Sequence, residues 1–413
     1  MIIKICRAAL LFGLVFCAEK IFAQPKVDYP LIVFPIADTI MNQQALNNFF
    51  AKLYRLDSGS KEKLSIVHIG DSHLQADFFT GEMRRQFQHC FGNAGRGLVF
   101  PYKVAATNGP LDLHTCSANN WEAKRNVFPN MLLPIGVSGI TIKTTDSAAA
   151  IHLLVTDNDD LDYGFTKLTL FSQKGPNSFD WCVTDTSNDL IGYINSMIID
   201  DQSPFTTTIH FKEPQHEIFL RTVKTDSLQS FGELYGIELG NDNAGVEYSM
   251  IGVNGAMYEH YNQSEYFAQQ LPALHPDLVI ISLGTNDSYV KYFDQFAFAE
   301  QVKKLVSSVK SKCPDVAILL TAPGDNYRYR RYKNLSIPFA VEQLQNVCNE
   351  DSLAFWNFFQ VMGGTGSMLK WKKSGYGQYD YLHFTRAGYE LEAELLYDAL
   401  MERYHQYLNG NHP

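Results

Sequence analysis

The sequence lacks several features that define common protein classes. No apolar run reaches the roughly 18 residues that a membrane-spanning helix needs, so no stable membrane span is expected. None of the seven cysteines forms a C-x-x-C pair, which removes the usual zinc and redox motifs. The chain has 34 Lys and Arg against 44 Asp and Glu, a net charge of −10, so the basic face that nucleic-acid binding requires is not expected.

The composition is that of a folded chain with a large interior. Hydrophobic residues make up 46% and charged residues 19%, so the chain has enough apolar surface to build a core and is not disordered by composition. Its 413 residues exceed the roughly 150 of one ordinary domain, which predicts two or three domains.

The first residues predict a targeting segment. Two basic residues precede an apolar stretch, residues 8–18, and Ala23 is a small residue suited to the position before a cleavage site. This pattern predicts a secretory signal peptide over residues 1–23, and hence an exported protein that is periplasmic or secreted. A membrane anchor is the alternative, because Ile21 is not ideal two residues before Ala23.

Signal-peptide cleavage would leave five cysteines. Exported proteins form disulfides more readily than cytosolic ones. Cys313 follows one predicted helix and Cys348 ends the next, so a bridge between them is one interpretation and separate buried thiols are the other. An odd number leaves at least one thiol free or paired between chains.

Short apolar strands alternate with helices near both ends of the chain. Apolar runs of this length are typical of strands buried on both faces, and apolar positions three and four residues apart indicate helices. Such alternation predicts a parallel sheet covered by helices on both faces. The predicted strands are 65–69, 278–283 and 316–320, and the predicted helices are 43–56, 80–89, 298–309, 339–348 and 387–404.

Residues from about 115 to 247 follow a different pattern. Apolar side chains alternate with polar ones in short runs, and turn-rich pieces separate the runs. Several short strands at this spacing predict an antiparallel β-sandwich. The strand-like runs are 140–142, 151–155, 205–211, 218–223 and 235–239.

Three short motifs lie at the ends of predicted strands, where ligands bind in open parallel sheets. In Gly70–His73, Ser72 stands between a strand and a helix, so its hydroxyl is exposed and its N–H is placed to bind an anion. In residues 254–255, the glycine lets the backbone approach a ligand closely. In Gly284–Asp287, the amide of Asn286 is able to donate to an oxyanion.

The fourth motif, Asp380–His383, has an aspartate three residues before a histidine. The aspartate is able to hold the imidazole in one tautomer while the other ring nitrogen faces a nucleophile. Each of the four motifs, taken alone, also fits a plain structural role such as a helix cap or a turn. Their occurrence together, in this order, favours nucleophilic catalysis by serine.

The combination of motifs resembles the SGNH, or GDSL-type, hydrolase superfamily, whose name gives the four residue types. The resemblance covers residues 24–110 and 248–413. It departs from the common pattern by having Gly-Asp-Ser-His in place of Gly-Asp-Ser-Leu, and by an interval of 183 residues between the serine and the glycine. The matching residues are Ser72, Gly255, Asn286 and His383.

With these two features, the chain resembles bacterial peptidoglycan O-acetylesterases. In those enzymes a module similar to a carbohydrate-binding jelly roll lies between the first and second motifs. Residues 362–371 and 380–389 also look like that group. The resemblance implies a three-layer α/β/α, flavodoxin-like hydrolase domain, split into residues 24–114 and 248–413. It also implies an antiparallel β-sandwich, jelly-roll-like, inserted at residues 115–247.

The resemblance further implies a serine esterase that removes O-acetyl groups from a cell-wall glycan, most simply peptidoglycan, without a metal or other cofactor. Ser72 would be the nucleophile, with His383 as its base and Asp380 orienting the imidazole. The N–H groups of Ser72 and Gly255 and the side chain of Asn286 would form the oxyanion hole.

Three alternatives stay open. The esterase could act on another acetylated polysaccharide such as xylan, or the acyl enzyme could transfer its acetyl group onto a glycan. In a different class, the sandwich would bind a glycan beside a relict hydrolase domain. The expected partner is an acetylated glycan in each case, and the oligomeric state is not predicted.

Three further segments have weaker signals. His73 either lines the pocket or packs beside the serine. Asp157–Asp160 suggests calcium, but Asp162 stands where a calcium-binding loop of the EF-hand type needs glycine, which favours a solvated turn. Tyr327–Tyr332 is a basic and aromatic run after a predicted strand, placed to contact carboxylates or sugar faces, with a solvated loop as the alternative.

Overall fold

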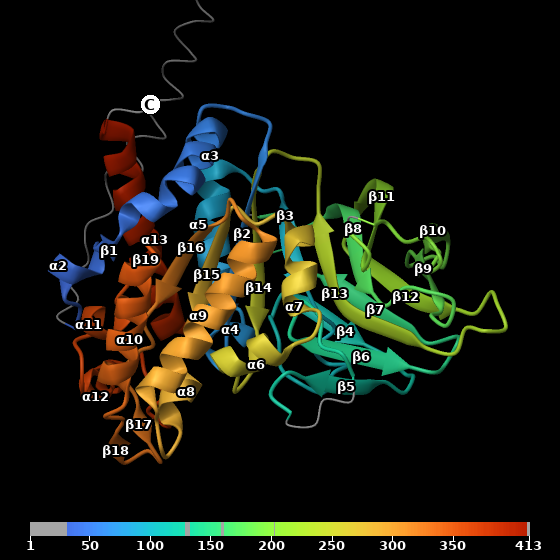
Figure 1. The fold of residues 1–413 in the computed structure, drawn as a ribbon. Coiled ribbons are helices and arrows are strands. Elements are labelled where there is room, and N and C mark those ends of the chain that lie inside the picture. Colours follow the sequence, from blue (N-terminus) through green and yellow to red (C-terminus); the bar gives the residue numbers. More distant parts are fainter. Residues whose placement is uncertain (1–30, 129–132, 158–160, 202, 411–413) are drawn as a thin grey trace, which may run out of the picture.

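The computed structural model describes residues 31–128, 133–157, 161–201 and 203–410. The predicted signal peptide and residues 158–160 of the acidic run lie outside these ranges. A helix-covered parallel sheet forms one side of the molecule and two antiparallel sheets form the other (Figure 1). In the described ranges, no helix combines the length and apolarity needed to cross a membrane.

The parallel sheet has the strand order β1-β19-β16-β15-β2-β14, in which only β1 runs antiparallel to its neighbour. Its central strands are buried along nearly their whole length, which is why they read as continuous apolar runs in the sequence. The strands are β1 (Ile40–Met41), β2 (Lys63–Gly70), β14 (Gly245–Gly252), β15 (Leu278–Ser282), β16 (Ala317–Thr321) and β19 (Ala354–Trp356).

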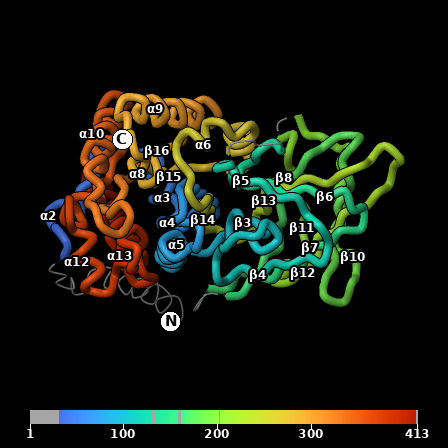
Figure 2. The backbone as a smooth tube through the Cα atoms, turned by 90° about the horizontal axis from the view of Figure 1, so that it is seen from below, coloured from blue at the N-terminus to red at the C-terminus, as the bar shows by residue number. Residues whose placement is uncertain are grey.

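Helices cover both faces of this sheet and make a three-layer domain (Figure 2). One face carries α3 (Asn47–Asp57), α5 (Phe78–Phe91) and α13 (Arg386–Asn409), which contact one another. The other carries α6 (Tyr258–Gln263), α7 (Phe267–Gln270), α9 (Gln295–Lys312) and α10 (Ile337–Glu350). The short helices are α2 (Phe34–Ala37), η1 (Gln43–Leu46), α4 (Ser72–Gln75), η2 (Leu271–Leu274), α8 (Thr285–Tyr289), α11 (Phe358–Val361) and α12 (Ser367–Lys373).

Helix α9 illustrates how the sequence determines these elements. The Asp294 carboxylate accepts hydrogen bonds from the N–H groups of Phe296 and Ala297, so it caps the first turn. The apolar stripe that predicts a helix over residues 298–309 is buried, and the helix contacts α10 and α6.

Two antiparallel sheets make up the inserted β domain, one with the order β10-β9-β12-β7-β4 and one with the order β11-β8-β13-β6-β5. The first contains β4 (Leu113–Cys116), β7 (Ala150–Val155), β9 (Asp180–Thr184), β10 (Leu190–Ile194) and β12 (Glu217–Val223). The second contains β5 (Glu122–Arg125), β6 (Ile140–Thr144), β8 (Phe165–Ser172), β11 (Thr206–Gln215) and β13 (Gly232–Gly240), with β3 (Gly95–Val99) also paired to β13. The predicted fold class, a helix-flanked parallel sheet with an antiparallel β insert, is confirmed.

The two parts of the chain are joined by continuous backbone pairing. Strand β13 of the insert leads directly into β14 of the parallel sheet, and β3 pairs with β13 while contacting β14. Residue 115 falls within β4 and residue 247 within β14. The division of the chain into domains at these two positions stays a prediction.

A buried ionic network stabilises this junction. Arg96, on β3, lies with its side chain only 1% exposed between two carboxylates. Its Nη2 is 2.6 Å from Asp77 Oδ2 and its Nε is 2.5 Å from Asp112 Oδ2. Arg84 completes the network with its Nη1 2.8 Å from Asp77 Oδ2. Burial opposes the charge on Asp77, but the two guanidinium groups outweigh it and hold the pKa of this carboxyl below its usual range.

Replacing Arg96 with methionine should therefore destabilise the protein strongly. The change leaves Asp112 without its guanidinium partner and Asp77 with one instead of two, and breaking a buried pair typically costs about 3–5 kcal/mol. Chemical unfolding of the variant and wild type measures the difference. Arg55→Met is the matched control, because its pair with Glu62 is about half exposed and should contribute less than about 1 kcal/mol. Equal effects of the two changes would contradict the role of the network.

Candidate active site

Ser72 stands at a sharp turn from β2 into α4. Gly70 ends the strand so close to α4 and β15 that a Cβ there would lie 2.5 Å from Leu74 Cδ1 and 2.9 Å from the Ser282 carbonyl oxygen. Asp71 caps the helix by accepting a hydrogen bond of 2.9 Å from the His73 N–H. Glycine at position 70 therefore permits the turn that presents the serine at the carboxyl edge of the sheet.

Three side chains from opposite ends of the chain form a hydrogen-bonded series. Ser72 Oγ lies 3.0 Å from His383 Nε2, and His383 Nδ1 lies 2.7 Å from Asp380 Oδ2. Asp380 Oδ1 also accepts bonds from the N–H groups of Leu382 and His383, at 2.9 and 3.0 Å. The structure thus brings the predicted nucleophile, base and carboxylate into the order that proton transfer from serine requires.

The charges in this series stabilise a protonated imidazole. Burial opposes the charge on Asp380, but hydrogen bonds from the His383 ring, from its N–H and from Leu382 hold the pKa of this carboxyl well below its usual range. Burial also opposes a charge on His383, yet the bond and the charge of Asp380 raise its pKa above the ordinary value of 6.5. An imidazolium formed during proton transfer would therefore meet a fixed negative partner.

Gly255 follows the end of β14, beside the serine turn. Its φ of +85° is accessible to glycine and strained for other residues, and a Cβ there would have only Val127 Cγ1 near it, at 4.0 Å. Among the described residues, neither the Gly255 N–H nor the Ser72 N–H donates a hydrogen bond. The two predicted backbone donors are thus both unused.

The third predicted oxyanion donor already has partners. The Asn286 amide, on α8, donates from Nδ2 to Asp71 Oδ2 at 2.9 Å and to the Ala256 carbonyl at 3.0 Å. Burial raises the pKa of Asp71 to about 6. Asn286 therefore joins the serine turn to the glycine loop, and to bind an oxyanion it must share or exchange one of these bonds.

Two residues that the sequence analysis did not select hold these loops together. The Gln75 side chain accepts a bond of 2.5 Å from the Asn254 N–H and donates to the Asn108 carbonyl at 2.7 Å. Asp287 Oδ1 accepts from the Tyr258 N–H at 3.2 Å, and burial raises the pKa of Asp287 to about 7. Gln75 follows the first motif and Asp287 is the last residue of the third, but their partners lie 29 to 179 positions away in the sequence.

His73 packs beside the histidine of the series. Its ring centroid lies 5.3 Å from that of His383, and its Nδ1 lies 3.3 Å from the Tyr389 hydroxyl. Burial, reinforced by the charge of His383, lowers the pKa of His73 to about 3. His73 is thus a half-buried ring that packs against His383, which accords with packing beside the serine.

The basic and aromatic run forms a hairpin of β17 (Tyr327–Arg328) and β18 (Tyr332–Lys333). The Tyr327 N–H donates to the Tyr381 carbonyl at 2.9 Å, so the hairpin is bonded to the turn that carries Asp380 and His383. This run therefore lies beside the turn of Asp380 and His383, at the active-site edge.

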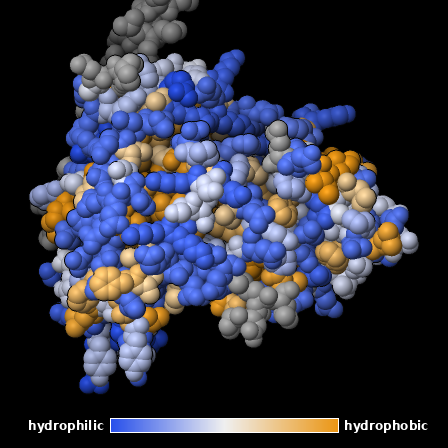
Figure 3. All heavy atoms as spheres, in the orientation of Figure 1, coloured by the Kyte–Doolittle hydropathy of each residue, from blue (hydrophilic) through white to orange (hydrophobic). Residues whose placement is uncertain are grey.

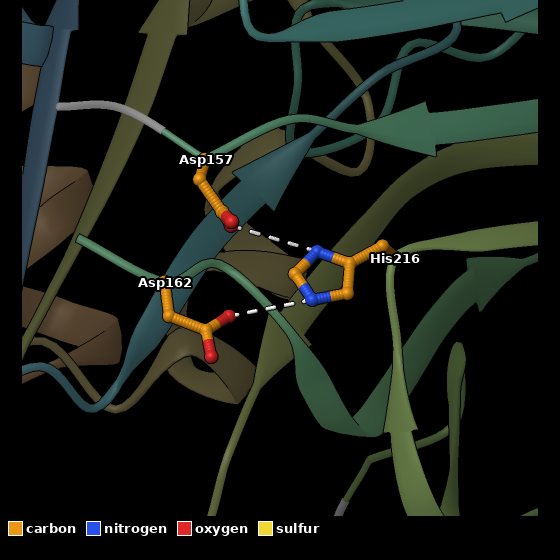
Figure 4. Close-up of side chains that lie close together, drawn as sticks. All are labelled: Asp157, Asp162 and His216. Carbon is orange, nitrogen blue, oxygen red and sulfur yellow. Dashed lines mark ion pairs between the residues drawn. The ribbon is translucent and has the colours of Figure 1, made fainter. Parts of the chain in front are cut away.

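The structure also brings together a group of possible metal ligands that the sequence analysis did not anticipate. In Figure 4, His216 lies between the carboxylates of Asp157 and Asp162, at 3.6 and 3.4 Å. The two aspartates are exposed, and their ion pairs with the histidine account for the arrangement. Asp157 and Asp162 also accept bonds from the N–H groups of Tyr163 and Gly164, which is typical of a solvated turn.

Cys313 and Cys348 do not form a bridge, and both are free thiols. Burial raises the pKa of both, most strongly for Cys348, which lies in the core at the end of α10. Among the two interpretations of this pair, the structure supports separate thiols.

At the edge of the parallel sheet, a serine is hydrogen-bonded to a histidine, which is hydrogen-bonded in turn to a carboxylate. This is the arrangement of serine hydrolases. Residues 223–391 match the model of the GDSL-like lipase/acylhydrolase family. This segment of the chain is therefore similar to the GDSL/SGNH family, a family of carboxylic ester hydrolases. The matched segment includes Gly255, Asn286 and His383, whereas Ser72 lies on the other side of the insert.

Two solved structures illustrate the likeness. A peptidoglycan O-acetylesterase is 22% identical, with a TM-score of 0.72 over 87% of this chain and 96% of that one. A lipase/acylhydrolase from Enterococcus faecalis is 21% identical over 39% of this chain and 77% of that one, with a TM-score of 0.31. No curated protein matched the sequence. The first likeness extends over both the helix-covered sheet and the β insert and thus shows the fold.

Proposed function

We propose that the protein is an exported serine esterase that removes O-acetyl groups from peptidoglycan. The observation that carries the proposal is the series Ser72–His383–Asp380, with its bonds of 3.0 and 2.7 Å. The cell-wall substrate is supported by the likeness in fold to a peptidoglycan O-acetylesterase across both parts of the chain. Export is supported by the pattern of residues 1–23.

The first half of the reaction would transfer acetyl to the enzyme. Ser72 Oγ attacks the ester carbonyl carbon while His383 Nε2 takes the serine proton, and Asp380 stabilises the imidazolium. Collapse of the tetrahedral intermediate breaks the bond to the sugar oxygen, which receives the proton from His383. The products of this half are the free sugar hydroxyl and acetyl-Ser72.

Water would complete the cycle. His383 takes a proton from the water as its oxygen attacks the acetyl carbonyl, and returns it to Ser72 Oγ as acetate leaves. In both halves the negative oxygen would lie against the unused N–H groups of Ser72 and Gly255 and the Asn286 amide. Access of water to acetyl-Ser72 decides between hydrolysis and transfer to a second sugar.

The substrate is tested by measuring acetate release from O-acetylated peptidoglycan and from acetylated xylan. The proposal expects kcat/KM to be at least about tenfold higher on peptidoglycan, a difference of roughly 1.4 kcal/mol in transition-state binding. Faster release of acetate from xylan would contradict the proposed substrate but would leave the proposed esterase activity standing. Binding of both polymers with no release from either would favour the interpretation as a glycan-binding protein.

Replacing Asn286 with alanine tests the third oxyanion donor. Loss of one such donor costs about 2.7–4 kcal/mol of barrier, so kcat on p-nitrophenyl acetate should fall about 10²–10³-fold with a small change in KM. Because Asn286 also links Asp71 to Ala256, thermal unfolding must be compared with wild type. A rise in KM with an unchanged kcat would show a role in binding or structure only.

A further inference from the structure

Two segments beside the active site concentrate positive charge in an acidic protein. Residues 326–341 and residues 363–379 contain no Asp or Glu, while the whole chain has a net charge of −10. They belong to the β17–β18 hairpin and to α12, which lie at the same lower end of the molecule as α8 in Figure 1. The seven cations, called here the cationic patch, are Arg328, Arg330, Arg331, Lys333, Lys370, Lys372 and Lys373.

Contacts between the segments make the patch continuous. A Cβ on Gly366, at the start of α12, would lie 3.0 Å from Lys333 Nζ of the hairpin. On α12, Lys372 Nζ lies 4.6 Å from the ring centre of Tyr379 and 5.9 Å from that of Tyr381. The Tyr381 ring in turn lies 5.6 Å from the Tyr327 ring of the hairpin.

The patch adjoins the residues that would perform the reaction. Tyr381 lies within the turn between Asp380 and His383, and its carbonyl accepts the Tyr327 N–H. The hairpin is also fixed at its base, because Arg328 Nη2 donates to the Ser288 carbonyl at 2.5 Å and to Ser336 Oγ at 2.8 Å. A polymer held on the patch would therefore lie at a fixed distance from Ser72.

Six of the seven cations remain available to a ligand. Arg328 is committed to the two bonds just described, but over the described ranges none of the others forms an ion pair with a carboxylate within 4 Å. Five of the available cations are exposed, and at four of these positions a substitution should leave the fold intact. They are Arg330, Arg331, Lys370 and Lys373.

Exposed tyrosines accompany these cations. Tyr329, Tyr332 and Tyr379 are 74%, 57% and 81% exposed. A tyrosine ring offers a flat apolar face and a polar tip, which suits a ligand that has both apolar and hydrogen-bonding surface. In Figure 3 this lower end mixes hydrophilic and hydrophobic side chains, so it combines charge with aromatic contact area.

We infer that the cationic patch binds carboxylate groups of a glycan that carries anionic side chains, and so selects this glycan as the substrate of the adjacent ester site. The inference rests on the proposed function and names the chemistry by which the polymer is recognised. Arginine and lysine form charge-assisted hydrogen bonds with carboxylates, and these bonds are stronger than neutral ones. A single glycan chain would contact the cationic patch alone. A flat anionic membrane would also face the acidic remainder of the protein surface, which would repel it.

The test compares two triple variants that change the charge equally. Arg330→Gln/Arg331→Gln/Lys373→Gln removes three exposed cations of the patch, and Lys61→Gln/Lys304→Gln/Lys312→Gln removes three exposed cations elsewhere. Each set is combined with Ser72→Ala for sedimentation binding to O-acetylated peptidoglycan with intact peptide stems, to neutral acetylated xylan and to vesicles containing phosphatidylglycerol. Each set is also measured without Ser72→Ala for turnover of p-nitrophenyl acetate.

The patch variant should bind peptidoglycan about tenfold more weakly than the control variant, and added NaCl should remove most of this difference. Binding to xylan and turnover of p-nitrophenyl acetate should be the same in both. Equal binding of both variants to peptidoglycan, or an equal loss on xylan, would overturn the inference, and a selective loss on vesicles would assign the patch to membranes. Binding through the patch without acetate release would instead defeat only the proposed function.

Discussion

Replacing Ser72 with alanine should abolish hydrolysis of p-nitrophenyl acetate by an otherwise folded protein. The variant has no oxygen to attack the carbonyl, while His383 and Asp380 keep their mutual bond of 2.7 Å. Residues of a catalytic triad act as a unit, so the loss of one costs nearly as much as the loss of all, and kcat should fall at least about 10⁴-fold.

The serine variant has a built-in structural control. Ser72 Oγ bonds to His383 Nε2 and is otherwise without a described partner, so its loss should leave the midpoint of thermal unfolding nearly unchanged. Ser311→Ala, at an exposed position on α9, provides a hydroxyl deletion outside the series and should keep kcat near that of wild type. Activity of the Ser72 variant within tenfold of wild type would show that another group attacks the ester.

Replacing Asp380 with asparagine should lower kcat by about 10⁴-fold without removing the side chain. The amide Oδ1 is still able to accept the N–H bonds of Leu382 and His383, so the turn should survive. Its NH₂ group, however, donates hydrogen bonds and cannot accept one from the Nδ1–H of His383, so the imidazole is driven into the wrong tautomer for accepting the proton of Ser72.

The pH dependence of the asparagine variant tests the same bond independently. In the wild type, Asp380 raises the pKa of His383 above 6.5, and activity should rise with pH as this histidine loses its proton. Without the carboxylate, the pKa falls, so the acid limb of the residual kcat/KM profile should move to lower pH. Asp315→Asn, at an exposed position after α9, should leave the profile in place. An acid limb unmoved by the loss of Asp380 would contradict the assignment of this limb to His383.

The sequence predicted the convergence of the motifs well because strand direction determines it. Ser72, Gly255 and Asn286 each follow a strand of one parallel sheet, and the carboxyl ends of parallel strands share an edge. Their separation of up to 214 positions did not matter, since each motif is local and the sheet supplies the long-range contact.

The bonds between motifs were not predictable in the same way. No local pattern indicates that the Asn286 amide is shared between Asp71 and Ala256, because the three residues come from different loops. Strand β3 was missed because Gly95 and Gly97, with φ of +134° and +78°, make its sequence read as a loop.

The buried network at Arg96 was equally hidden. A basic residue next to glycines suggests a solvated turn, and its partners Asp77 and Asp112 are 19 and 16 positions away. Only the folded structure, which brings Arg96 of β3 between Asp77 and Asp112, removes the guanidinium from water and makes its carboxylate partners necessary.

The placement of β14 has a consequence for how the chain folds. Gly70 of β2 pairs with Gly252 of β14, so the neighbouring strands that carry Ser72 and Gly255 are separated by the whole β insert along the chain. Closing so long a loop slows the formation of native contacts. Apart from the β13–β3 pairing, the strand pairs of the β insert close shorter loops, at most the 92 positions between Leu234 and Ile142, so the insert is able to assemble before β2 finds its partner. Until then β2 exposes an apolar edge that is prone to aggregation, so a stable insert would shorten the time for which this edge stays open.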